Sequence, residues 1–163
     1  MYKAAVVGAG RIGAGFDSPD NGDTLTHTKA LLKHDRVSDI VLVDCAQDRL
    51  REETTKWGVP GYKSLNAMLE AVRPDIVSVC VPTEQHAAVL RELHEVAIPV
   101  IIAEKPLTDD LQESKKIVEL FEHSKTALVV NYTRRWDAAL VEMRKRYLSG
   151  ELGRFLHGSG LYT

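Results

Sequence analysis

The sequence has little of what marks secreted or membrane proteins. Only two of its 163 residues are cysteines, Cys45 and Cys80, and they stand far apart. That spacing indicates neither a disulfide framework nor a metal site. We expect two small buried thiols in a reducing compartment. No apolar run approaches the roughly 20 residues that a membrane span needs.

An excess of charge of either sign is also absent. The formal net charge is −2, from 21 basic and 23 acidic residues, so neither a nucleic acid nor a membrane surface is expected as a partner. The N-terminus runs directly into an apolar stretch, without the basic segment and apolar core of a secretory signal. We therefore expect a globular protein of the cytoplasm.

What the sequence does have is a glycine-rich turn at its start. The apolar run Tyr2–Val7 has the length of a strand, and a G-x-G-x-x-G pattern follows it at once, formed by Gly8, Gly10, Arg11, Ile12 and Gly13 with the intervening alanine. The first glycine of such a turn allows the tight bend, the second lets the backbone approach a pyrophosphate, and the third lets a helix pack on the strand. The first amides of that helix would bind the anion. The pattern predicts a dinucleotide site.

A run of turn-forming residues interrupts the helix that should follow. Residues 15–23, GFDSPDNGD, cannot continue a helix, so they indicate a loop inserted after one helical turn. Thr26 is then the expected N-cap of a helix to about His34. Since this loop leaves the glycine turn at the mouth of the cofactor site, His27 and Thr24 either meet the substrate or belong to a solvated surface loop.

An acid closes the second apolar run, residues 39–44. In a dinucleotide fold, an acid in this place accepts hydrogen bonds from the adenine ribose and disfavours a 2′-phosphate, so Asp44 favours NAD. Its distance from the glycine motif exceeds the usual value of roughly 20 residues, and the inserted loop accounts for the excess. Asp44 is also a candidate cap for the helix near Ala46, and Arg49 nearby would tolerate a 2′-phosphate, which leaves NADP open.

Further along, apolar runs of strand length alternate with helical patterns. Strands are expected around residue 62 and over residues 76–81, 98–103 and 126–130. Thr83 is a candidate cap for the helix over 84–96, and Thr108 or Asp109 for a helix to about His123. The order of elements predicts an α/β Rossmann fold, a doubly wound and mostly parallel sheet of six strands.

The C-terminal part continues with an amphipathic helix to about Leu148, whose apolar stripe reads as core and consists of Trp136, Leu140, Met143 and Tyr147. Residues 154–163 predict one further strand with nothing after it to pair with. We therefore divide the chain into a dinucleotide-binding domain over 1–150 and the first strand of an absent C-terminal α/β domain over 151–163. An unpaired strand edge favours association with another chain, so a homo-oligomer is a further expectation.

Four separated motifs resemble the ordered signatures of the Gfo/Idh/MocA oxidoreductases: the glycine turn, CVPTEQH over residues 80–86, EKPL over 104–107 and NYTRR over 131–135. The resemblance covers about residues 1–150. It implies NAD- or NADP-dependent hydride transfer at a C–OH/C=O centre of a sugar, a cyclitol or a related small molecule. Members of the family have a second α/β domain, and this chain stops where it would begin, so turnover by the chain alone is not expected. The alternative is a non-catalytic module that binds a dinucleotide or recruits a partner.

The resemblance also implies roles for single residues. Lys105 would lie near the nicotinamide and the substrate hydroxyl; independently, a lysine held at a strand end in a partly dry crevice loses proton affinity and can polarise a reacting oxygen. The alternative for Lys105 is a surface ion pair with Glu104. A cis peptide before Pro106 would fix the direction of Lys105.

The other positions that the resemblance brings in lie on both sides of the nicotinamide. Pro82, Thr83, His86 and Glu104 would line the cofactor side, with His86 a hydrogen-bonded helix residue rather than a proton carrier. Asn131 and Arg135 would join Lys105 on the substrate. No residues point to a metal site.

Overall fold

The computed structural model describes residues 1–157 and 159 of the chain. They belong to two units, residues 1–131 and residues 132–163, and each unit is described by itself. No helix in the described part of the chain has the length and apolar character that crossing a membrane would require.

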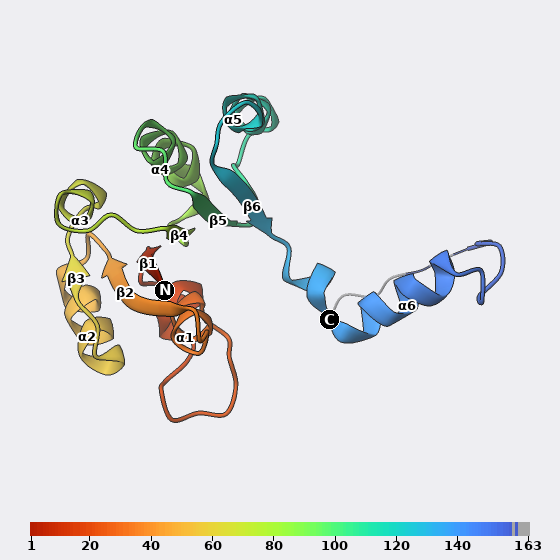
Figure 1. Cartoon of the computed structure of the whole chain (residues 1–163), viewed down its shortest axis with the longest axis horizontal. Helices are drawn as coiled ribbons and strands as arrows, with labels where there is room; N and C mark the ends of the chain where they lie inside the picture. Colours follow the sequence, from red (N-terminus) through yellow and green to blue (C-terminus); the bar gives the residue numbers. More distant parts are fainter. Residues whose placement is uncertain (158, 160–163) are drawn as a thin grey trace. The chain divides into compact units, whose positions relative to one another are not determined.

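The first unit is built on a sheet of six parallel strands (Figure 1). In sequence order the strands are β1 (Tyr2–Val7), β2 (Val37–Val43), β3 (Gly61–Tyr62), β4 (Ile76–Val79), β5 (Val100–Glu104) and β6 (Ala127–Asn131). Their order across the sheet is β3-β2-β1-β4-β5-β6. The strand order reverses beside β1, which is where a doubly wound sheet opens its ligand crevice. The predicted Rossmann fold is confirmed.

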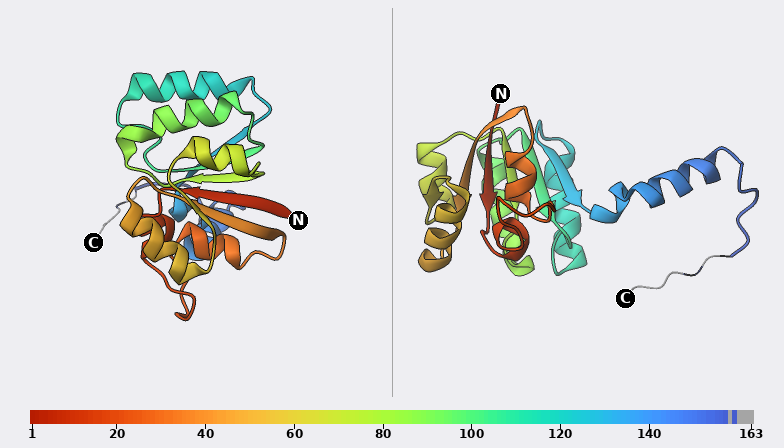
Figure 2. Two further views of the ribbon diagram at one scale, coloured as in Figure 1. Left: turned by 90° about the vertical axis from the view of Figure 1, so that its left-hand side faces the viewer. Right: turned by 90° about the horizontal axis from the view of Figure 1, so that it is seen from below.

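Helices cover both faces of this sheet, as the two views of Figure 2 show. The helices of the first unit are η1 (Arg11–Gly15, a short π-helix), α1 (His27–Leu32), α2 (Gln47–Trp57), α3 (Leu65–Ala71), α4 (Thr83–Glu95) and α5 (Leu111–Glu122). One core joins the strands to α3, α4 and α5, with Met68, Leu90 and Ile117 fully buried. A second core lies under η1 and α2 and includes Leu42 and Trp57.

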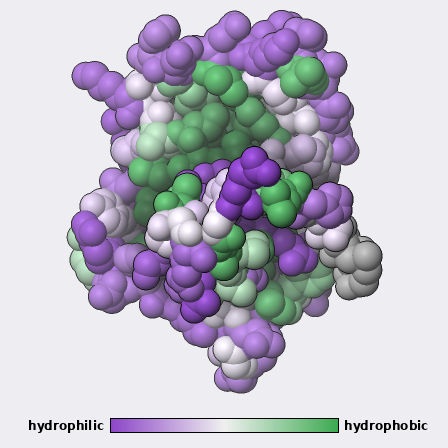
Figure 3. All heavy atoms as spheres, turned by 90° about the vertical axis from the view of Figure 1, so that its right-hand side faces the viewer, coloured by the Kyte–Doolittle hydropathy of each residue, from purple (hydrophilic) through white to green (hydrophobic). Residues whose placement is uncertain are grey.

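Edge strand β6 leaves part of its apolar surface open. Val129 on this strand is 42% exposed, and Leu128 and Val130 line a shallow groove with Val118 and Phe121 of α5. Figure 3 faces this side of the molecule and shows hydrophobic residues gathered on the surface. In α5, Ile117 and Phe121 are buried in the core and Leu120 packs against it partly buried, whereas Leu111 and Val118 are exposed.

The inserted loop after η1 is closed on itself. Asp17 is buried, and its Oδ2 accepts hydrogen bonds from the amides of Leu25 at 2.6 Å and Thr26 at 2.7 Å. The buried Lys29 ammonium donates to the carbonyls of Ser18 at 2.7 Å and Asn21 at 2.6 Å. The predicted cap is confirmed, because Thr26 Oγ1 accepts from the Lys29 amide. These contacts fix the start of α1, and with it His27.

Several local predictions differ from the structure. Thr83 is the first residue of α4, and the cap position is Pro82, which has no side-chain acceptor. The cap of α5 is Asp110 rather than Thr108 or Asp109: its Oδ1 accepts from the Glu113 amide at 2.8 Å. Of the two cysteines only Cys80 is buried, whereas Cys45 is exposed.

The second unit contains η2 (Thr133–Trp136) and α6 (Ala138–Leu148). The stripe predicted to be core is exposed, from 40% at Leu140 to 72% at Trp136. Residues 154–157 form no strand, so the predicted last strand is wrong for these residues; residues 158 and 160–163 lie outside the described residues. The expected homo-oligomer would form through this strand, and residues 154–157 do not form it.

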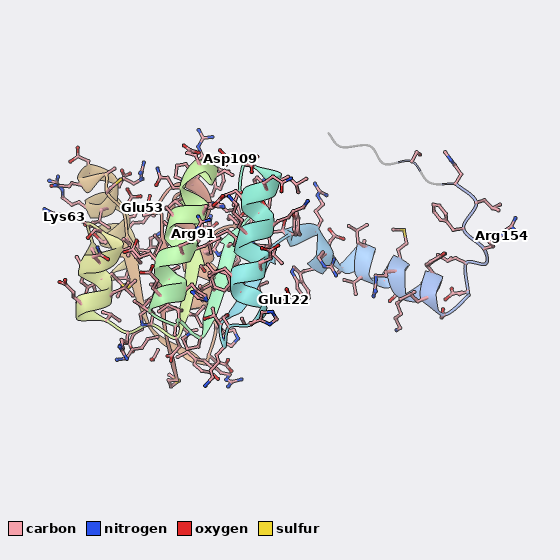
Figure 4. All side chains as sticks on the ribbon, turned by 90° about the horizontal axis from the view of Figure 1, so that it is seen from above. Glu53, Lys63, Arg91, Asp109, Glu122 and Arg154 are labelled. Atoms are coloured by element: carbon pink, nitrogen blue, oxygen red, sulfur yellow. The ribbon has the colours of Figure 1, made fainter. Side chains whose placement is uncertain are left out.

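We expect Asp110→Ala to destabilise the protein by about 1 kcal/mol, because the Glu113 amide at the start of α5 loses its acceptor. Asp109, labelled in Figure 4, is exposed, lies one residue earlier and provides the matched control. Asp109→Ala should leave the free energy of unfolding within about 0.5 kcal/mol of the wild type. Urea titration measures both values, and equal effects of the two variants would contradict the assignment of the cap.

Candidate functional site

A groove of about 660 Å³ opens at the C-terminal ends of β1, β2 and β4. Six residues predicted for the cofactor line it, namely Gly8, Gly10, Arg11, Ile12, Asp44 and Pro82. Segments far apart in the sequence meet here because the strands are parallel and end at the same edge of the sheet. The groove is where the sequence predicts the dinucleotide.

The three glycines of the turn meet different surroundings. Gly8 has φ +96°, and a Cβ on it would lie 2.6 Å from the backbone of Cys80. A Cβ on Gly13 would lie 2.0 Å from the Gly8 carbonyl oxygen. A Cβ on Gly10 would meet no atom within 4 Å. The fold itself therefore requires glycine at positions 8 and 13, whereas position 10 faces open space in the groove.

Asp44 ties the glycine turn to the end of β2. Its Oδ2 accepts from the Ala9 amide at 2.9 Å and its Oδ1 from the Ala46 amide at 2.8 Å. Arg49 donates to both oxygens, from Nε and Nη2, at 2.8 Å each. A carboxylate has about four acceptor positions, so the protein itself occupies all of them. The cap position of α2 is Ala46, and Asp44 contacts its amide from two residues earlier.

The charge of Asp44 is stabilised in place. Burial is the largest single effect and opposes ionisation, but hydrogen bonds from Arg49, Ala46 and Ala9, with the charge of Arg49, outweigh it and lower the pKa of Asp44 below its ordinary 3.8. The Arg49 side chain is 48% exposed. The carboxylate is therefore fixed, while the guanidinium has solvent on one side.

Glu104 lies at the end of β5, outside the groove lining. Its Oε1 accepts from Asn131 Nδ2 at 2.6 Å and from His27 Nε2 at 3.0 Å. Burial opposes the ionisation of Glu104, yet these two hydrogen bonds and the other contacts lower its pKa. Lys105 is exposed, and no ion pair joins it to Glu104 among the described residues. The alternative of a surface ion pair between them is thus not what the structure has.

The loop that follows Lys105 is held by His86. The Lys105–Pro106 peptide is cis, as expected. His86 is 1% exposed, with Nδ1 3.0 Å from the Pro106 carbonyl oxygen and Nε2 2.9 Å from the Val81 carbonyl oxygen. It is a hydrogen-bonded helix residue, as the sequence predicted, and it lies behind the groove wall rather than on it.

Of the remaining predicted residues, Gly13, Thr83 and Asn131 are not among the residues that line the groove. Gly13 is buried beneath the turn and Thr83 begins α4. Asn131 lies beside Glu104. Arg135 lies in η2, in the second unit.

Other residues line the groove without having been predicted. Phe16 opens the inserted loop, Lys63 follows β3 directly, and Gln85 lies in the first turn of α4. Lys63 is labelled in Figure 4. All three sit just past the C-terminal end of a strand or of the glycine turn, so the rule that ligands bind at that edge would have found them. Gln85 belongs to the CVPTEQH motif over residues 80–86, whereas the local sequence around Phe16 and Lys63 carries no motif.

The lowered pKa of Asp44 predicts a pH-dependent stability. Because ionised Asp44 is favoured in the folded state, its contribution is present above pH 3.8, the ordinary pKa, and is lost as the pH falls through the lower folded value. At pH 7 we expect Asp44→Asn to lower the free energy of unfolding by about 2 kcal/mol. Urea titrations should show the difference shrinking below pH 3.8.

The matched control is Asp48→Asn, one turn along in α2, where the carboxylate is 98% exposed and pairs with Arg51 on the surface. Its effect should stay within about 0.5 kcal/mol at every pH. A penalty for Asp44→Asn that did not change with pH would contradict the stabilised carboxylate.

Comparison with known proteins agrees with this geometry. The chain is 31% identical to an inositol 2-dehydrogenase of Corynebacterium glutamicum over 165 aligned positions, which cover 98% of this chain and 45% of that protein. It is 26% identical to a myo-inositol 2-dehydrogenase of Thermotoga maritima, over 93% of this chain and 42% of that protein. The chain thus spans less than half the length of these curated relatives.

Solved structures share the fold. The WlbA dehydrogenase from Chromobactrium violaceum, solved in complex with NADH and UDP-GlcNAcA, superposes with a TM-score of 0.77 at 26% identity, over 94% of this chain and 41% of that one. A myo-inositol 2-dehydrogenase from Lactobacillus plantarum gives a TM-score of 0.80 at 20% identity, over 95% and 43%. The model of the oxidoreductase family with the NAD-binding Rossmann fold matches residues 2–132. The chain belongs to the Gfo/Idh/MocA oxidoreductase family and matches it over this NAD-binding fold.

Proposed function

We propose that this chain is the cofactor-binding part of an oxidoreductase that moves a hydride between NAD and a C–OH/C=O centre of a sugar, a cyclitol or a related small molecule. When bound, the nicotinamide ring accepts or donates the hydride. The named substrates and ligands of the relatives, inositol and UDP-GlcNAcA, support this substrate class. On this proposal residues 1–150 are the dinucleotide domain, and 151–163 lead into the part of the relatives that this chain does not span.

The observation that carries the proposal is the open space at Gly10. Its φ of −70° suits any residue, and a Cβ there would meet no protein atom within 4 Å. The absence of a side chain therefore serves something that approaches from outside, and the first amides of η1, at Arg11 and Ile12, have no acceptor within the helix. A pyrophosphate fits this cradle in size and charge.

The adenosine end of the cofactor would lie toward Asp44. Since the protein occupies every acceptor position of this carboxylate, ribose hydroxyls can reach it only when the Arg49 fork turns away. A 2′-phosphate would instead meet Arg49 itself. Arg49 therefore decides how well NADP competes with NAD.

At the other end, Lys105 would serve the substrate. It directly follows β5 at the edge of the sheet where the groove opens, and its ammonium offers three donors without an ion pair to Glu104 among the described residues. Its role would be to orient the reacting oxygen and stabilise charge on it. Thr83 and His86 would shape the cofactor side from behind, through Pro82 and the Val81 carbonyl.

The first experiment is isothermal titration of the folded chain with NAD. Gly10→Ala should keep the fold and weaken NAD binding about tenfold or more, because the methyl group occupies space that the pyrophosphate needs. Gly22→Ala is the matched control, since a Cβ there also meets nothing within 4 Å and Gly22 lies outside the groove lining. Equal affinity of Gly10→Ala and the wild type would remove the phosphate site from this turn.

A second titration compares NAD with NADP in Arg49→Met. We expect NADP affinity to fall about tenfold or more, because a charged hydrogen bond to the 2′-phosphate is lost, while NAD affinity is kept or increased as Asp44 is released. Arg51→Met serves as the control, since Arg51 is on the same helix and pairs with Asp48 outside the groove. A loss of the same size for both cofactors would argue against this role of Arg49.

A further inference from the structure

Three distant segments meet at the end of β5. His27 is the first residue of α1, Glu104 ends β5 and Asn131 ends β6, and their side chains form one cluster in which His27 Nε2 and Asn131 Nδ2 lie 3.3 Å apart. Both nitrogens address the same atom, Glu104 Oε1. Because an ionised carboxylate only accepts, both nitrogens donate to it. We call these three residues the His27 cluster.

The cluster directs the carboxylate away from the neighbouring lysine. Glu104 is 8% exposed, and its second oxygen lies 3.3 Å from the Lys105 amide nitrogen rather than by the ammonium. The charge of Glu104 also acts on Cys80, which lines the groove. Burial is the larger cause that raises the pKa of the Cys80 thiol, and the negative charge of Glu104 raises it further. The Glu104 carboxylate is therefore charged and fixed, and its hydrogen bonds go to His27, Asn131 and the Lys105 amide rather than to Lys105 Nζ.

An ammonium paired with a carboxylate offers fewer donors and less net charge to a substrate oxygen. Lys105 adjoins Glu104 in the chain, so it is the cation most available to this carboxylate if its two donors are removed. We propose that His27 and Asn131 are positioning residues for Lys105: by holding Glu104 they keep the Lys105 ammonium free for a substrate oxygen. This inference rests on the proposed function, which assigns Lys105 to the substrate.

The inserted loop has a place in this arrangement. Asp17 and Lys29 close the loop, and Thr26 caps the helix that His27 begins. His27 consequently reaches Glu104 from a fixed helix start. The inserted loop thus connects the glycine turn to His27 and places this side chain at the end of β5.

The test measures the reactivity of Lys105 in the full chain. An amine-acylating reagent is added for short times, and modification of each lysine is quantified by mass spectrometry of its peptide. In His27→Leu and in Asn131→Leu we expect Lys105 to react about two- to fivefold more slowly, the range that an exposed ion pair provides, because the released Glu104 pairs with the ammonium. Simple loosening of the strand end would leave the rate unchanged or raise it.

Three further variants separate positioning from damage to the fold. His27→Gln keeps an N–H donor and should restore the wild-type rate. Glu104→Gln in the His27→Leu background removes the carboxylate and should also restore it. His34→Leu, just past α1, removes an imidazole that faces Asp35 on the surface and should change nothing.

An unchanged or increased rate in both His27→Leu and Asn131→Leu would overturn the inference, as would a slow rate that persists without the Glu104 carboxylate. NAD titration of the same samples keeps the two proposals apart. If the wild type failed to bind NAD, the proposed function would fail whatever the rates; if it bound NAD while the rates stayed equal, only the positioning role would fail.

Discussion

The close contact of backbone with backbone at the end of β1 is the constraint on which this domain depends. Gly8 lies against the main chain of Cys80 at the end of β4, and Gly13 lies against the carbonyl of Gly8. Side chains at either position would push η1 off the sheet and uncover the core that includes Val6 and Leu42. The same atoms therefore hold the second core closed below and leave the groove open above. Stability and ligand access are set by one turn.

Two buried acids also hold segments together at this edge of the sheet. Asp44 and Glu104 follow or end parallel strands, and the burial of each charge is compensated by donors from other elements. Each acid adds a side-chain link between segments far apart in the sequence: Asp44 connects β2 with the glycine turn, and Glu104 connects β5 with α1 and β6. These two carboxylates are buried and held in place by hydrogen bonds. The basic side chains near them, Arg49 and Lys105, are more exposed to solvent.

Much of this architecture could be predicted from the sequence, because a parallel sheet buried on both faces produces continuous apolar runs that are easy to find. The glycine turn and the acid that ends the second run were recognisable for another reason. Both have a local sequence pattern, and both stand directly after an apolar run of strand length. The cap of α5 was not, because residues 108–110 are all plausible acceptors and only tertiary geometry selects Asp110.

What could not be predicted depends on distance in the sequence. The partners of Glu104 lie 77 and 27 residues away, and no local pattern links them. Arg49 was noticed near Asp44, yet the two-pronged contact that fills the carboxylate follows only from coordinates. The stripe from Trp136 to Tyr147 shows a further limit: amphipathic periodicity says that a helix has an apolar face, and it says nothing about what covers that face.

The closed loop between η1 and α1 has a consequence for how such domains diversify. Its ends are pinned by Asp17 and Thr26, and its interior is braced by a lysine amine among carbonyls. Residues can be added or lost between Asp17 and Thr26 while the start of α1 keeps its position. A loop of different length or composition can thus stand beside the groove that Phe16 lines while the position of His27 stays the same.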